Sequence, residues 1–343
     1  MTRPLSICFV STLVGLLTLP AQAKLDEQCV MQAVEEGDAT SVAEIKRKCT
    51  LPDEYEFPEE GYTLDPLKSF SSETDVAPKP RRIIQAHRPN YFTMSYYTDP
   101  NDEPFELEDG DNLKRYEAKF QVSFKLPVWS FSDRTKLYFA YTARSWWQVT
   151  DQGRSRPFRE TNHQPEIFNE WVLDPQYYSL LDDLDYFAVR LGVAHESNGQ
   201  TIELSRSWNR AYLEFIAKDH SVFKDGDQMY FSFSPWIRFP ENQKSSPDDP
   251  TGDENPNIER TVGQAEFVLA WRESADAVDS FSVRFRNNFR AKNRSLIELN
   301  WGHRLSPYLE IYTQLTSGWG ENLLDYNRYS NRIAVGARLT DWF

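Results

Sequence analysis

A histidine and a serine stand two residues apart at His195 and Ser197, and an asparagine follows at Asn209. Residues of these types can carry out acyl transfer. An imidazole can take the proton of a serine hydroxyl and so make its oxygen a nucleophile. A side-chain amide oxygen can accept a hydrogen bond from the other ring nitrogen, which fixes the tautomer and orientation of the ring. Whether this chemistry is available depends on the elements that carry the three residues.

The alternation of side chains predicts a hairpin with all three residues on one face. The segment 186–194 has apolar residues at every second position: Phe187, Val189, Leu191 and Val193. Continuing this alternation puts His195 and Ser197 on the same face, because successive side chains of a strand point to opposite sides. In the segment 207–219 the same rule adds Asn209 to the apolar face. We therefore expect the three residues to meet on the apolar side of the sheet, near one rim.

Glu196 is the alternative partner for the imidazole. It lies between His195 and Ser197, so its side chain is expected on the opposite, polar face. This parity favours Asn209 as the third member. A second interpretation assigns these residues no chemistry and makes them polar rim residues beside lipid head groups.

Segments of about ten residues with alternating apolar and polar side chains run from about residue 90 onward, separated by turn residues. Twelve strands are expected, at 91–97, 117–129, 136–149, 162–173, 186–198, 207–219, 229–239, 263–274, 279–288, 294–305, 308–320 and 328–343. This pattern, with aromatic residues at strand ends and a terminal Trp342-Phe343, is typical of a transmembrane β-barrel. In lipid the sheet must close, since an open edge leaves backbone groups unpaired. The predicted fold class is all-β, a twelve-stranded antiparallel transmembrane barrel with a short acidic N-terminal extension. The alternative is a soluble β-sandwich or lipocalin-like barrel.

The first 23 residues predict a secretory signal peptide. Arg3 supplies a positive start, an apolar stretch follows, and Ala21-Gln22-Ala23 is a cleavage site of the small-residue type. The mature chain then keeps Cys29 and Cys49, and two cysteines in an exported protein favour one disulfide. A pair of free thiols is the alternative.

Charge and hydropathy exclude two classes of protein. The chain has 52 acidic residues against 38 Lys and Arg, a net charge of −14, which excludes a nucleic-acid binder that works by bulk charge. Mean hydropathy is −0.64, and no apolar run of about 18 residues follows the signal, which excludes a helical membrane bundle.

Residues 24–80 hold 14 acidic residues against six Lys or Arg. The predicted division is a signal peptide at 1–23, an acidic extension and linker at 24–80, and the barrel at 81–343.

Five blocks of sequence carry long motifs: His195-Glu196-Ser197-Asn198-Gly199, Ser205-Arg206-Ser207-Trp208-Asn209-Arg210, Arg144-Ser145-Trp146-Trp147-Gln148, Pro157-Phe158-Arg159-Glu160-Thr161-Asn162, and the stretch from Gly318 to Asn327. From about residue 89 to 343 the chain resembles the outer-membrane phospholipase A family. The resemblance implies a twelve-stranded barrel that hydrolyses acyl esters of phospholipids, at either position, and of lysophospholipids. It also implies that Ser197 is the nucleophile, His195 the base and Asn209 the residue that orients the base.

The resemblance further implies a Ca²⁺ site and activation by a reversible homodimer in the bacterial outer membrane. The matching ligands are the backbone carbonyl of Gln200, the hydroxyl of Ser205, and Ser155 of the partner subunit. Ala143, one position before the Arg144-Ser145 pair, stands where the best-known member of the family has a lipid-facing glutamine that bonds across the dimer, so one polar contact is absent; small residues still allow close packing in lipid.

The competing function is a non-catalytic barrel that acts as a scaffold or a narrow pore. Inward residues such as Arg190, Glu214 and Lys218 are expected to fill the lumen by pairing, which argues against a wide pore. His87, His163, His220 and His303 show no metal-ligand spacing and are interpreted as ordinary surface or lumen residues.

Overall fold

The computed structural model describes residues 84–103, 105, 112–174, 184–201, 203–246, 249 and 252–339. The predicted signal peptide, the acidic extension with its two cysteines, and the terminal Trp342-Phe343 lie outside the described residues. The domain division and the disulfide therefore stay predictions.

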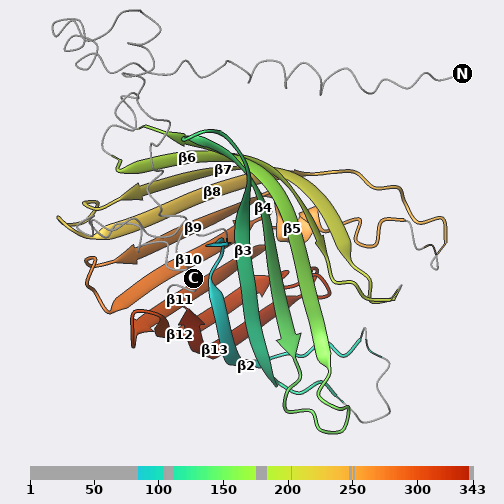
Figure 1. The fold of residues 1–343 in the computed structure, drawn as a ribbon. Coiled ribbons are helices and arrows are strands. Elements are labelled where there is room, and N and C mark those ends of the chain that lie inside the picture. Colours follow the sequence, from blue (N-terminus) through green and yellow to red (C-terminus); the bar gives the residue numbers. More distant parts are fainter. Residues whose placement is uncertain are drawn as a thin grey trace, which may run out of the picture. The chain divides into compact units, whose positions relative to one another are not determined.

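Twelve antiparallel strands form a closed barrel (Figure 1). They are β2 (Asn90–Tyr97), β3 (Tyr116–Ser132), β4 (Thr135–Trp147), β5 (Phe158–Leu173), β6 (Tyr186–Ser197), β7 (Ser207–Asp219), β8 (Gln228–Arg238), β9 (Ala265–Arg272), β10 (Asp279–Asn287), β11 (Ser295–Arg304), β12 (Leu309–Trp319) and β13 (Tyr329–Leu339). Each pairs with the next along the chain, and β13 pairs with β2 to close the sheet. The prediction of twelve strands is confirmed, and their bounds differ by at most four residues within the described part of the chain.

The side-chain alternation does not predict two short elements. The two-residue strand β1 (Gln85–Ala86) pairs with β3, and the one-turn helix α4 (Glu259–Val262) lies in the connection between β8 and β9. Both are too short for a periodic signal to develop. Among the described residues, no helix is long and apolar enough to cross a membrane.

The two faces of each strand differ in the way that a lipid environment demands. On β13, Ile333 and Val335 are exposed by 47% and 50%, whereas Arg332 and Arg338, at positions of the opposite parity on the same strand, are buried. Apolar side chains thus cover the outside, and charged side chains fill the inside. This inversion of the soluble-protein pattern is the property that distinguishes a membrane barrel from a soluble one.

The lumen is filled by paired charges. Arg190 donates from Nε to Glu170 Oε2 at 2.6 Å and from Nη1 to Glu214 Oε2 at 3.0 Å, as predicted for its pairing with Glu214. Lys218 is buried on the same inner face. A cavity of about 140 Å³ remains between inward-facing side chains.

The connection between β12 and β13 folds inward and is buried against β5. Asn162 Oδ1 accepts the Leu323 N–H at 3.1 Å, and Glu160 Oε1 accepts the Leu324 N–H at 2.8 Å. Arg159 Nη1 donates to Asp325 Oδ2 at 2.8 Å. The sequence blocks 157–162 and 318–327, which both support the family resemblance, are therefore hydrogen-bonded to each other. They lie at the end of the barrel that also carries the β6–β7 connection.

Candidate active site

His195 and Asn209 face each other on neighbouring strands. Residue 195 lies near the end of β6 and residue 209 near the start of β7, and the antiparallel register pairs the two directly. Both belong to the outward face, as the alternation predicts, with Val193 (43% exposed) one step along the same face. His195 is exposed, while Ser197 and Asn209 are half-buried. The three side chains therefore occupy the lipid-facing surface near one rim.

The His195 ring is held by the Asn209 amide. Its Nδ1 lies 2.8 Å from Asn209 Oδ1. An amide oxygen only accepts hydrogen bonds, so Nδ1 carries the proton in this bond and Nε2 keeps a free lone pair. This is the tautomer in which a histidine can remove a proton through Nε2.

Ser197 ends β6 and lies on the same face as His195. Its Oγ accepts the Gly199 N–H at 3.2 Å, and Gly199 adopts a positive φ of 62° in the turn that follows. Within the described chain, no hydrogen bond joins Ser197 to His195. Residues two apart on one strand have their side chains about 7 Å apart at the base, so the χ1 rotamer of Ser197 decides whether its hydroxyl reaches the ring. Catalytic hydrogen bonds are often long before substrate binds.

Glu196 is fixed on the inner face. Its carboxylate accepts from Arg144 Nη2 at 3.1 Å, from Arg210 Nη1 at 3.0 Å and from Trp208 Nε1 at 3.1 Å. The side chain is buried in this cluster. The parity argument that turned Glu196 away from His195 is confirmed.

The β6–β7 connection is organised by the buried side chain of Asn198. Its Nδ2 donates to the Leu204 carbonyl at 2.8 Å, and its Oδ1 accepts the N–H groups of Gln200 at 3.3 Å and Arg206 at 3.0 Å. These bonds fix the short segment that carries two of the expected calcium ligands. No feature of the sequence alone assigns this role to Asn198.

Two of the expected calcium ligands, Gln200 and Ser205, offer oxygen atoms that no other group of the described chain engages. Among the described residues, no hydrogen bond engages the Gln200 carbonyl or the Ser205 hydroxyl. Uncharged oxygens of these kinds suit the hard Ca²⁺ ion, so the residues fit the group. Ser155 is exposed in the separate connection between β4 and β5, where its backbone adopts a positive φ of 58°.

Sequence reasoning missed Glu241, which contacts the other end of the Asn209 amide. Asn209 Nδ2 donates to Glu241 Oε1 at 3.1 Å. Glu241 follows β8 in an irregular segment, and no periodic pattern relates it to β7. Only the fold brings it to Asn209.

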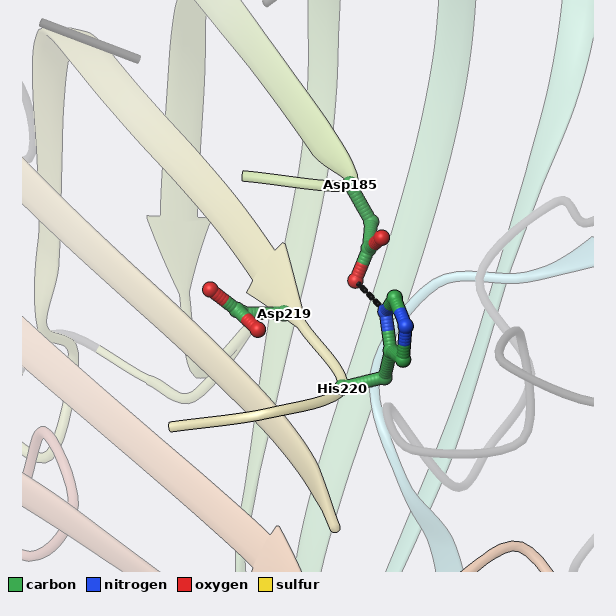
Figure 2. Close-up of side chains that lie close together, drawn as sticks. All are labelled: Asp185, Asp219 and His220. Atoms are coloured by element: carbon green, nitrogen blue, oxygen red, sulfur yellow. Dashed lines mark hydrogen bonds and ion pairs between the residues drawn. The ribbon is translucent and has the colours of Figure 1, made fainter. Parts of the chain in front are cut away.

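A second cluster of polar side chains lies at the opposite ends of β6 and β7. Figure 2 shows Asp185, Asp219 and His220, whose ligand atoms lie within 4.8 Å of one another. His220 Nδ1 is hydrogen-bonded to Asp185, and this bond raises the pKa of His220 above its ordinary value. Asp219 Oδ1 accepts the Ser221 N–H at 2.7 Å. An ion pair and a turn cap account for these contacts, and the cluster is separate from His195.

A closed barrel with an apolar outer face, carrying serine, histidine and asparagine on that face, defines the class: an outer-membrane enzyme that acts on lipid. The family model described as Phospholipase A1 matches residues 67–339, and the chain belongs to this family. Phospholipase A1 of Escherichia coli is 30% identical over 259 residues, covering 74% of this chain and 80% of the relative. Phospholipase A1 of Klebsiella pneumoniae is 29% identical over 266 residues, covering 76% and 84%. The protein is therefore a phospholipase of the bacterial outer membrane.

Solved structures agree with this assignment. Outer membrane phospholipase A from Escherichia coli aligns with a TM-score of 0.64 at 27% identity, covering 76% of this chain and all of that one. A Salmonella typhi outer membrane phospholipase, solved as a dimer with bound calcium, aligns with a TM-score of 0.64 at 26% identity, covering 79% and 96%.

Proposed function

We propose that this chain hydrolyses the acyl esters of phospholipids and lysophospholipids with Ser197 as nucleophile, His195 as base and Asn209 as the residue that orients the base. The observation that carries the proposal is the 2.8 Å bond between His195 Nδ1 and Asn209 Oδ1 on the lipid-facing surface. A related Escherichia coli structure is described as an active-site mutant in which one asparagine is replaced by alanine. That description supports an asparagine in the site of this family.

The reaction proceeds in two halves. His195 Nε2 takes the Ser197 proton as Oγ attacks the ester carbonyl carbon, and the protonated ring then gives that proton to the departing glycerol oxygen. Water attacks the resulting acyl-serine with His195 again as base, and fatty acid leaves as Ser197 regains its proton. The Gly199 N–H, which donates to Ser197 Oγ at 3.2 Å, supplies a backbone donor for the developing oxyanion.

The outward position of the site suits a substrate that does not dissolve in water. Val193 and Ile237 are exposed by 43% and 67% on the same outer surface. A phospholipid can reach Ser197 by lateral diffusion with its acyl chain against these side chains, so the chain stays in an apolar environment throughout.

Ca²⁺ would be held by the Gln200 carbonyl and the Ser205 hydroxyl together with Ser155 of the partner subunit. When bound, the ion would supply positive charge that stabilises the oxyanion. Because one ligand would come from the second copy, a homodimer would complete the site and a monomer would leave it incomplete. The calcium-bound dimer of the Salmonella typhi relative supports this arrangement. Ala143 contributes no polar contact to such a dimer, but a small residue at this position still allows close packing in lipid.

The test measures fatty-acid release from phosphatidylethanolamine in mixed micelles, with calcium and then with chelator. Wild type and Ser197→Ala are compared after both are shown to migrate as folded, heat-modifiable barrels. We expect calcium-dependent release by wild type and none by the variant. Release that survives in Ser197→Ala would overturn the assignment of the nucleophile, and a folded wild type without release would favour the non-catalytic scaffold.

A further inference from the structure

The Asn209 amide is held at both ends. Its oxygen bonds to His195 Nδ1 at 2.8 Å, and its NH₂ group donates to Glu241 Oε1 at 3.1 Å. The backbone supports the second contact, since the Phe239 N–H donates to the Asn209 carbonyl at 2.8 Å. This bond anchors the segment that follows β8 beside the start of β7.

Glu241 is itself fixed in place. Its side chain is 23% exposed, and its second oxygen, Oε2, lies 3.7 Å from Arg238 Nη2. Arg238 is tied in turn to Asp253 Oδ1 at 2.7 Å. The Glu241 carboxylate is therefore part of a charged cluster with Arg238 and Asp253, which restrains its position.

The chemistry of the two groups makes the contact directional. An ionised carboxylate only accepts hydrogen bonds, whereas an amide has one donor end and one acceptor end. The NH₂ of Asn209 must therefore face Glu241, which turns its oxygen toward His195. An oxygen acceptor at that point requires the proton on Nδ1, so Nε2 is left to act on Ser197. A flipped amide would set oxygen against oxygen at Glu241 and leave Nδ1 facing a donor.

We propose that Glu241 is a positioning residue that sets the orientation of the Asn209 amide and, through it, the reactive tautomer of His195. This inference rests on the proposed function of Ser197, His195 and Asn209. It also explains why residue 209 is an amide: a carboxylate there would lie about 3 Å from the Glu241 carboxylate, and two charges at that distance repel strongly.

The first experiment compares Glu241→Leu and Glu241→Gln in the full chain, in calcium-containing micelles. Glu259→Leu is the matched control, because Glu259 is a half-buried acid of the same β8–β9 connection without a contact to Asn209 among the described residues. We expect Glu241→Leu to lower kcat about tenfold with little change in KM. Glu241→Gln keeps an acceptor oxygen for the Asn209 NH₂ and should recover most of that loss, while Glu259→Leu should match wild type.

The second experiment tests the charge argument. Asn209→Asp should lose activity because of repulsion from Glu241, and adding Glu241→Gln should restore part of it, so the double variant is more active than Asn209→Asp alone. Unchanged kcat in Glu241→Leu, or no recovery in the double variant, would overturn the proposal. Ser197→Ala distinguishes failure of the proposed function from failure of the positioning role. If Ser197→Ala keeps activity, the proposed function is wrong. If Ser197→Ala is inactive while Glu241→Leu has normal activity, only the positioning role of Glu241 is wrong.

Discussion

Replacing Asn209 by alanine tests the orienting bond at the candidate site. The substitution removes the acceptor that lies 2.8 Å from His195 Nδ1 but leaves the imidazole and Ser197 in place. A hydrogen bond to a charged group contributes about 1.5–3 kcal/mol, and the ring becomes charged when it takes the Ser197 proton. Since about 1.4 kcal/mol of barrier corresponds to tenfold in rate, kcat should fall about 10- to 150-fold.

The assay is the steady-state rate of fatty-acid release in mixed micelles, with kcat and KM determined separately and folding checked by heat-modifiable mobility. KM should change little, because Asn209 acts on the ring and not on the lipid. A kcat within twofold of wild type would refute the reasoning, as the bond would then contribute nothing to the reaction. A loss as complete as that of Ser197→Ala, in a folded barrel, would also refute it, since it would make Asn209 more than an orienting group.

Three further predictions follow from other contacts. Glu196→Ala leaves Arg144 and Arg210, whose side chains are 15% and 11% exposed, without the carboxylate that they share. Loss of one partner of a largely buried ion pair should lower the free energy of unfolding by about 3 kcal/mol, measured by denaturant titration in detergent; an unchanged midpoint would contradict this pairing. Mixing Ser155→Ala subunits with Ser197→Ala subunits should restore activity that neither has alone, because the heterodimer joins an intact Ser197 to an intact Ser155; no recovery on mixing would contradict a shared calcium site. The bond to Asp185 raises the pKa of His220, so the stability that this ion pair contributes is present at acidic pH and is lost as pH rises through that pKa. The difference in melting temperature between wild type and His220→Asn should therefore be larger at pH 6 than at pH 9. An equal difference at the two pH values would refute the pairing.

The strands were predictable from the sequence because side-chain alternation reports directly on the two faces of a barrel. The same rule placed Glu196 inside and His195 outside, on adjacent positions of one strand. The rule predicts these positions correctly because the lumen of this barrel is charged and its outer face is apolar, so alternate side chains differ clearly in polarity.

Contacts made by irregular segments were not predictable in the same way. Glu241 reaches Asn209 from a connection without periodicity, and the connection that contains Leu323 and Leu324 folds into the lumen although two neighbouring leucines would suit a lipid-facing position equally well. His87, interpreted as an ordinary surface or lumen residue, has a side chain that is only 4% exposed, and the sequence does not indicate its contact with Glu166, whose Oε1 lies 2.8 Å from its Nε2. Each of these depends on tertiary pairing across long sequence separation, which a local pattern does not record.

Covalent labelling identifies the nucleophile most directly. The folded protein in calcium-containing micelles would be treated with a long-chain, serine-reactive phosphonate, and the labelled position would be found by peptide mass mapping. We expect one adduct, on Ser197, that requires calcium and is absent in His195→Ala. An adduct on another serine, or one that forms equally well in Ser197→Ala, would contradict it.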